Sequence, residues 1–250
     1  MLCTFSPYKQ GLGCSNIDIF KMIKSLIPFL FFVAIVQCNF VEELENFEDE
    51  IKLSDLFIAA EYVSPCEAEF NSVKSCLSDV SANYNVSDPR SLLDKDLMVS
   101  IIQDFENSSC FAPSDCANVK VAKHIYDTLI FIGVEIYYEG FECVLKIVND
   151  TEALEETAKH CANVILLSGT VELDSVSAIL AVIKPLGDCI IERQQCTPVE
   201  KEALIAAVHK GVDLFAAYKN PEVLLKELNL TKADISKEEL TNVFLFFAHF

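Results

Sequence analysis

Glycine and proline are scarce in this chain, which has 7 and 8 of them among its 250 residues. Turn-rich β-proteins need these residues at many positions, whereas leucine, alanine, glutamate and lysine favour helices and are abundant here. Hydrophobic residues make up 52% of the chain, which is enough for a buried core. The composition therefore predicts an all-α fold and argues against disorder as the main state.

The chain also lacks the motifs that mark common catalytic and metal sites. It has no His-Glu-x-x-His zinc motif, no Gly-x-Ser-x-Gly nucleophile elbow, no glycine-rich phosphate loop, no Cys-x-x-Cys pair and no EF-hand loop. Neighbours on a helix point about 100° apart, so adjacency does not make His160 and Cys161 a catalytic pair. We expect no catalytic residue, cofactor or metal site. The four histidines are scattered: His124, His160, His209 and His249.

Basic residues are outnumbered, with 19 Lys and Arg against 38 Asp and Glu, and the formal net charge is −19. Nucleic acids and anionic membranes would be repelled by this field, so we expect neither as a partner. The acidic run over residues 42–50 is typical of a solvated helix face. A cationic partner or Ca²⁺ is compatible with the charge.

The apolar run over residues 26–36 is too short to cross a bilayer but has the length of a signal-peptide core. Lys21 and Lys24 supply the basic flank that such signals carry. The sequence therefore predicts a leader over residues 1–38 and a secreted domain over residues 39–250. We expect no stable membrane insertion.

The leader leaves two points open. Cleavage after Cys38 or just after Val36 follows the small-residue preference of signal peptidase only loosely. Export signals normally begin within a few residues of the start, which makes Met22 a better initiator than Met1. A genuine long segment before the signal is the alternative.

The cysteine count supports export. Eleven is odd, but Cys3, Cys14 and Cys38 fall in the leader. Eight cysteines remain, an even number, as a fully paired secreted framework needs. We expect all of them in disulfides: Cys66, Cys76, Cys110, Cys116, Cys143, Cys161, Cys189 and Cys196.

Asparagine-linked glycosylation fits the same compartment, because the chain carries four Asn-x-Ser/Thr sequons. Three of them fall where the helical pattern breaks, on expected surface loops. The expected acceptors are Asn85, Asn107, Asn149 and Asn229.

Several expected helices begin with a capping residue followed by proline at the first helical position. In some of them a glutamate three residues after the cap completes a capping box. Both signals occur at Ser64-Pro65-Cys66-Glu67 and Thr197-Pro198-Val199-Glu200; Asp88-Pro89 and Asn220-Pro221 have the cap without the glutamate, and Ser236 with Glu239 has the box without the proline.

The spacing of apolar residues gives the extent of the helices. After Ser64, an apolar stripe runs through Phe70, Val73 and Leu77 to Tyr84. A second helix is expected over residues 89–106, with one side formed by Leu93, Leu97, Ile101 and Phe105.

Residues 116–138 are more apolar and predict a central buried helix rather than a membrane span, since Asp127 and Glu135 interrupt them. The C-terminal phenylalanines favour a docked helix. No linker divides the series, so we expect one domain. Further helices are expected over residues 151–167, 175–183 (ended by Pro185), 186–195, 198–218, 221–228 and 237–250.

Helix geometry also constrains the disulfides. Cys66 and Cys76 share an expected helix, where ten residues rise about 15 Å. A disulfide needs Cα atoms within about 7 Å, so we expect these two cysteines not to be bonded to each other. The same holds for Cys189 and Cys196 if they share a helix, since seven residues rise about 10 Å.

The cysteine framework resembles a known family. The segments Cys110-Phe-Ala-Pro-Ser-Asp-Cys116 and Gly140-Phe-Glu-Cys143-Val-Leu-Lys-Ile147 resemble the nematode-expanded family of secreted cysteine-rich domains catalogued as domain of unknown function nineteen. Cys66 with Cys76, and Cys189 with Cys196, are similar to that family's opening and closing pairs. The insect haemolymph 27 kDa glycoprotein family is a weaker second match. Either resemblance implies secretion and a helical disulfide scaffold, and neither implies catalytic residues.

We therefore expect a secreted, disulfide-rich helical glycoprotein that acts by binding an extracellular protein. A carrier of a small hydrophobic ligand is the alternative, because cross-linked helices can enclose an apolar cavity and 18 phenylalanines could line it. An enzyme without a recognisable motif is the third possibility.

Overall fold

The computed structural model describes residues 64–84, 89–168 and 176–248. Within these ranges the chain is helical and contains no strand, which confirms the expected all-α, disulfide-cross-linked class. The leader with both candidate start sites, the acidic run over residues 42–50, Asn85, the Asp88 cap and His249 lie outside the described residues.

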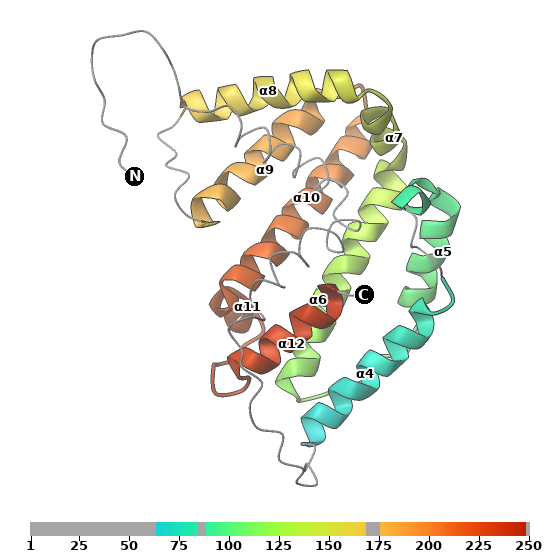
Figure 1. The fold of residues 1–250 in the computed structure, drawn as a ribbon, viewed down its shortest axis with the longest axis vertical. Helices are drawn as coiled ribbons and strands as arrows, with labels where there is room; N and C mark the ends of the chain where they lie inside the picture. Colours follow the sequence, from blue (N-terminus) through green and yellow to red (C-terminus); the bar gives the residue numbers. More distant parts are fainter. Residues whose placement is uncertain (1–63, 85–88, 169–175, 249–250) are drawn as a thin grey trace, which may run out of the picture.

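The described part of the chain begins with two helices joined by a 3₁₀-helix, which we call the helical arm, and continues into a long central helix (Figure 1). The arm consists of α4 (Pro65–Ser81), the 3₁₀-helix η1 (Pro89–Leu93) and α5 (Lys95–Glu106). The central run consists of α6 (Ala117–Val134), the π-helix η2 (Glu135–Gly140) and α7 (Phe141–Asn149). The remaining helices are α8 (Thr151–Ser168), α9 (Val176–Glu192), α10 (Pro198–Lys219), α11 (Pro221–Glu227) and α12 (Lys237–Ala248).

The capping signals place three helix starts correctly. The Ser64 side chain accepts a hydrogen bond from the Glu67 N–H at the start of α4. Thr197 and Glu200 form a complete capping box at α10, and Ser236 and Glu239 form one before α12. A fourth start, at Asn220-Pro221, is also placed correctly, since Asn220 is the N-cap of α11 and Pro221 its first residue, but the Asn220 side chain makes no capping hydrogen bond.

The expectation of a single helix over residues 89–106 is wrong, because the segment forms η1 and α5 instead. Asp94 leaves the helical conformation (φ −94°, ψ 97°) and accepts a hydrogen bond from the Leu97 N–H, so η1 ends and α5 begins there. A short acidic side chain competes well for backbone N–H groups, which favours such a cap over a continuous helix. The buried face of α5 is accordingly Met98, Ile102 and Phe105, whereas Leu93 is exposed.

Residues 175–195 contain one helix where two were expected, because Pro185 lies inside α9. Proline removes one backbone hydrogen bond, to the carbonyl four residues earlier. Pro185 and Ala181, which carries that carbonyl, are both exposed. Water can therefore satisfy the carbonyl, and α9 continues through the proline.

The central run extends to residue 149, beyond the expected end near residue 138. Gly140 does not end it. A Cβ at Gly140 would lie 2.6 Å from Cδ2 of Leu204, so glycine is needed there for α10 to approach η2 closely. The expectation of a central buried helix is confirmed, since α6 packs against α4, α5, α10 and α12.

Two clusters of buried side chains lie along the pair formed by α6 and α10. The first joins α4, α6, α11 and α12; its centre includes Leu77, Ile125, Leu224 and Val243. Phe244 and Phe247 of α12 are buried in it, as the C-terminal phenylalanines predicted. The second cluster joins the central run to α8, α9 and the first half of α10; it includes Ile132, Cys143, Cys161, Ile191 and Leu204.

Candidate functional site

All eight cysteines of the expected secreted framework are paired. The bonds are Cys66–Cys116, Cys76–Cys110, Cys143–Cys196 and Cys161–Cys189, with Cα–Cα distances of 5.3 to 5.8 Å. Cys66 and Cys76 are thus not bonded to each other, as helix geometry required. Cys189 and Cys196 are not bonded either, although Cys196 lies beyond the end of α9.

The bonds form two nested pairs. In the first disulfide unit, residues 66–116, the outer bond Cys66–Cys116 encloses Cys76–Cys110. In the second disulfide unit, residues 143–196, the outer bond Cys143–Cys196 encloses Cys161–Cys189. With these eight sulfurs bonded to one another, no thiol among them is available as a nucleophile or a metal ligand.

Two of the three described histidines contact charged or acidic side chains. His160 Nε2 lies 2.7 Å from an Arg193 guanidinium nitrogen, while the adjacent Cys161 is fully buried in its disulfide. His209 Nε2 lies 2.7 Å from Asp188 Oδ1 across α9 and α10. His124 is half-buried on α6. Nothing in this arrangement resembles a nucleophile with its base.

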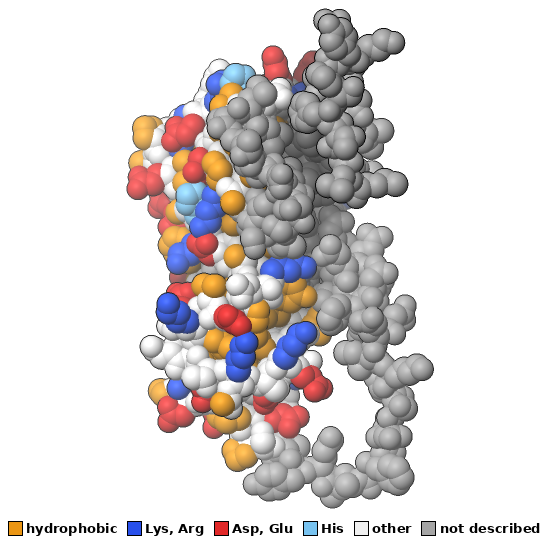
Figure 2. Space-filling model, turned by 90° about the vertical axis from the view of Figure 1, so that its left-hand side faces the viewer, with side chains coloured by type: hydrophobic (Ala, Val, Ile, Leu, Met, Phe, Trp, Pro, Cys, Tyr) orange, Lys and Arg blue, Asp and Glu red, His pale blue; other side chains and the backbone are white. Residues whose placement is uncertain are grey.

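The sequence analysis missed a polar seam between α9 and α10. Beside the Asp188–His209 contact, the Lys184 ammonium lies 2.6 Å from Asp213. A signal was present in the sequence, since residues 184 and 188 and residues 209 and 213 are each four apart and carry complementary polar groups. Figure 2 shows this side of the molecule, where acidic and basic side chains are interspersed. Such half-exposed pairs help to orient the two helices.

Metal binding has no geometric basis among the described residues, because they contain no group of three His, Cys, Asp or Glu side chains that could hold an ion. The buried side-chain nitrogen and oxygen atoms in these ranges all have hydrogen-bond partners. Asn118, for example, donates to the Cys66 carbonyl and accepts from the Val119 N–H. Its role is to hold α4 against α6.

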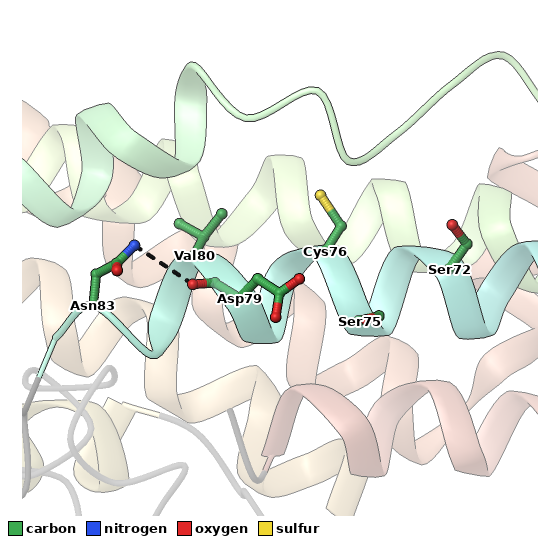
Figure 3. Close-up of a pocket in the computed structure, with 6 residues that line it drawn as sticks. All are labelled: Ser72, Ser75, Cys76, Asp79, Val80 and Asn83. Atoms are coloured by element: carbon green, nitrogen blue, oxygen red, sulfur yellow. Dashed lines mark hydrogen bonds between the residues drawn. The ribbon is translucent and has the colours of Figure 1, made fainter.

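A shallow groove of about 460 Å³ runs along α4 (Figure 3). Val80 and the bonded Cys76 are its apolar part, and Asn83 donates a hydrogen bond to the Asp79 carbonyl at its end. One helix supplies all its lining residues. Its open shape is unlike the enclosed apolar cavity that a hydrophobic-ligand carrier needs. The lining residues are Ser72, Ser75, Cys76, Asp79, Val80 and Asn83.

Three of the four expected glycan acceptors lie in the described residues, and all three are exposed. Asn107 is the C-cap of α5, and Asn149 is the last residue of α7. Asn229 follows α11 with a positive φ of 54°, a conformation that asparagine tolerates better than most residues. A glycan could be accommodated at each of these helix ends without displacing a core residue.

The outer side of the central run carries exposed aromatic and acidic side chains. Phe131 is 37% exposed and Tyr138 is 38% exposed. Glu135 lies between them and is half-buried. Partial burial, together with the nearby carboxylates of Glu139 and Glu202, raises the pKa of Glu135 above its usual value. By contrast, Tyr137 points inward and donates to the Leu92 carbonyl, and burial raises its pKa to about 12.

Among the described residues, no helix has the length and apolar character needed to cross a bilayer. Comparison of the chain with protein-family models, curated proteins and solved structures finds no match. The family resemblances therefore stay expectations from the sequence, and the function must be inferred from the geometry.

Proposed function

We propose that this chain is a secreted, disulfide-cross-linked glycoprotein that acts through its surface by binding an extracellular protein. The observation that carries the proposal is the complete pairing of the eight cysteines in four disulfides. Disulfides of this kind form and persist in oxidising compartments. The signal-like run over residues 26–36 supplies the route to such a compartment.

Binding is favoured over catalysis because the groups that most often act as nucleophile and base, the described cysteines and two of the described histidines, are engaged with other groups. The two best-placed histidines are paired with Arg193 and Asp188. The groove on α4 is lined by one helix and contains no histidine and no free thiol. A rigid helical scaffold that presents side chains to a partner needs none of these.

Secretion is tested by expressing the full chain in a eukaryotic cell line and sequencing the N-terminus of the product. We expect the protein in the medium, starting near residue 37 or 39. A cytosolic protein that retains residues 22–36 would overturn the proposal. Glycosidase treatment of the same material should increase its electrophoretic mobility. An unchanged mobility would show that the sequons carry no glycan.

The carrier alternative is tested on protein purified from the medium without denaturation. Organic extraction followed by mass spectrometry should release no apolar compound at a stoichiometric amount. A stoichiometric lipid or other apolar ligand would replace the surface-binding proposal with the carrier function. Extracted medium from cells that lack the expressed chain is the control.

A further inference from the structure

We propose that the outer face of the α6–η2–α7 run is a docking surface for a basic amphipathic segment of a partner protein. The surface is formed by Phe131, Glu135, Tyr138, Glu139 and Glu142. This inference rests on the proposed binding function and names its site and the chemistry of the partner.

The apolar part of the surface is aromatic. Phe131 of α6 and Tyr138 of the π-helix η2 are both exposed, whereas their neighbours Ile132 and Tyr137 on the same run are buried. Val134 lies half-buried between them. Exposed aromatic side chains on a rigid helix are the residue type that most often dominates binding energy, because they bury much area with little loss of side-chain entropy.

The polar part of the surface is uniformly negative. The sequence contains no Lys or Arg between Lys123 and Lys146, whereas Glu135, Glu139 and Glu142 lie within that interval. Glu202 of α10 adds a further negative charge near Glu135. None of these four carboxylates has a cationic partner within ion-pair distance among the described residues. The raised pKa of Glu135 is consistent with this lack of compensation.

The cations closest along the chain are already engaged elsewhere. Lys123 pairs with Asp127 at 2.7 Å. Lys146 lies 3.8 Å from Glu200, in the capping box of α10. Lys95 of α5, distant in the sequence, lies beside the run, with its ammonium 5.7 Å from the centre of the Phe141 ring, but it forms no ion pair with the three glutamates within the described residues. The surface therefore lacks compensating charge that a partner could supply.

The chemistry of the partner follows from charge complementarity. Lys or Arg side chains of the partner would neutralise the three glutamates, and apolar side chains between them would cover Phe131 and Tyr138. An amphipathic helix or strand with basic residues provides both in one segment. A second copy of this chain would bring another strongly acidic surface, since each copy carries a net charge of −19.

The test uses the full secreted protein and a fluorescent synthetic amphipathic peptide of leucine and lysine as the probe. Binding is measured by fluorescence anisotropy at physiological ionic strength. The variant Phe131→Ala/Tyr138→Ala and the variant Glu135→Gln/Glu139→Gln/Glu142→Gln should each weaken probe binding by about tenfold. The altered side chains are on the surface, and circular dichroism confirms that each variant is folded.

The matched control is Glu152→Gln/Glu155→Gln/Glu156→Gln, which removes the same charge from the exposed side of α8. We expect it to change probe binding less than twofold, because only the mean field is altered. Equal weakening by the control and the surface variants would overturn the inference, as would an unchanged affinity in all of them. Concentration-dependent self-association that the aromatic variant abolishes would assign the face to a second copy instead. These results leave the test of secretion unaffected.

Discussion

The two disulfide units have the same nested order of bonds but cross-link different kinds of structure. In the first unit, both bonds connect α4 to the segment between α5 and α6, which has no regular helix and contains Cys110 and Cys116. In the second unit, the inner bond connects helix α8 to helix α9. The inner bond of the first unit thus fixes an irregular segment, whereas the inner bond of the second unit reinforces the packing of two helices.

This difference indicates where each unit obtains its stability. The irregular segment of the first unit has few backbone bonds of its own, and its position depends on the two disulfides and on contacts such as that between Ser108 and Tyr126. The helices of the second unit also pack directly against each other and against α10. Each bond joins one buried cysteine to a half-buried one: the buried ones are Cys143 and Cys161, at 0% exposure, in the second unit, and Cys110 and Cys116, at 8% and 7%, in the first.

The largest effect is expected from removing the inner disulfides. The inner bonds close loops of similar length, with sequence separations of 34 and 28 residues, so their effects on unfolded-state entropy are similar. Cys161→Ala/Cys189→Ala should lower the free energy of unfolding by about 4 kcal/mol and Cys76→Ala/Cys110→Ala by about 3 kcal/mol, since the former also leaves a buried cavity. Urea unfolding measures both values.

Amide hydrogen exchange shows which residues lose protection when each inner disulfide is removed. Without Cys76–Cys110, amides of residues 107–116 should exchange rapidly while α4 and α6 stay protected. Without Cys161–Cys189, protection should fall across α8 and α9 together. Uniform loss of protection in both variants would mean that the two units do not differ in this way.

A smaller effect is expected where each unit packs on the central pair of helices. In the second unit, a Cβ at Gly187 would lie 2.9 Å from Cγ1 of the β-branched Val208. Beside the first unit, a Cβ at Gly133 would lie 3.0 Å from the flexible tip of Ile102. Gly187→Ala should destabilise the protein by about 1–2 kcal/mol, whereas Gly133→Ala should be nearly neutral because alanine also favours the helix.

Thermal unfolding of the two glycine variants provides the measurement. A lower midpoint for Gly187→Ala than for Gly133→Ala supports tighter packing of the second unit. The reverse order would show that α5 is the more rigidly packed helix.

The smallest effects concern the caps. Ser64→Ala at the start of the first unit and Thr197→Ala just after the second should each cost about 1 kcal/mol, with the larger loss at Thr197 because its capping box is complete. The Thr197 N–H hydrogen bond lowers the pKa of Glu200. This carboxylate therefore stabilises the fold above its unfolded-state pKa, and that contribution is lost as the pH falls through the lowered folded-state pKa.

The free energy of unfolding, measured from neutral to acidic pH, checks this predicted direction of the pH dependence. The difference between Glu200→Gln and the parent protein should shrink as Glu200 becomes protonated, because the variant lacks the carboxylate that accepts the Thr197 N–H. A difference that grows with acidity would contradict the assigned role of the Thr197–Glu200 box. Ser64→Ala serves as the control, since its recorded cap bond involves a hydroxyl and a backbone N–H.

The sequence predicts local features of this fold better than those that depend on neighbours. The sequence predicts the helix starts at Ser64, Thr197 and Ser236, because the capping side chain and the backbone N–H that it satisfies lie within four residues of each other. The expected helix end at Pro185 is wrong, because the free-energy cost of a proline inside a helix depends on whether the carbonyl that loses its hydrogen bond faces water. The close approach at Gly140 likewise depends on a residue far away in the sequence, since a Cβ there would lie 2.6 Å from Cδ2 of Leu204.

The candidate surface and the disulfides show the same limit. Helix geometry excludes the bond between Cys66 and Cys76, but it does not choose among the remaining partners, because that choice depends on how helices pack. Similarly, the spacing of Phe131 and Tyr138 alone does not fix their common side, because the run changes from α-helix to π-helix at Glu135. Only the packing of α5 and α10 on the other sides reveals that this side is exposed.

The most direct test of this account is peptide mapping of the secreted protein without reduction. We predict linked peptides for Cys66–Cys116, Cys76–Cys110, Cys143–Cys196 and Cys161–Cys189, and no free thiol among these eight cysteines. A bond between the two units, or a reduced cysteine among the eight in the secreted protein, would contradict both the nested framework and the comparison drawn from it.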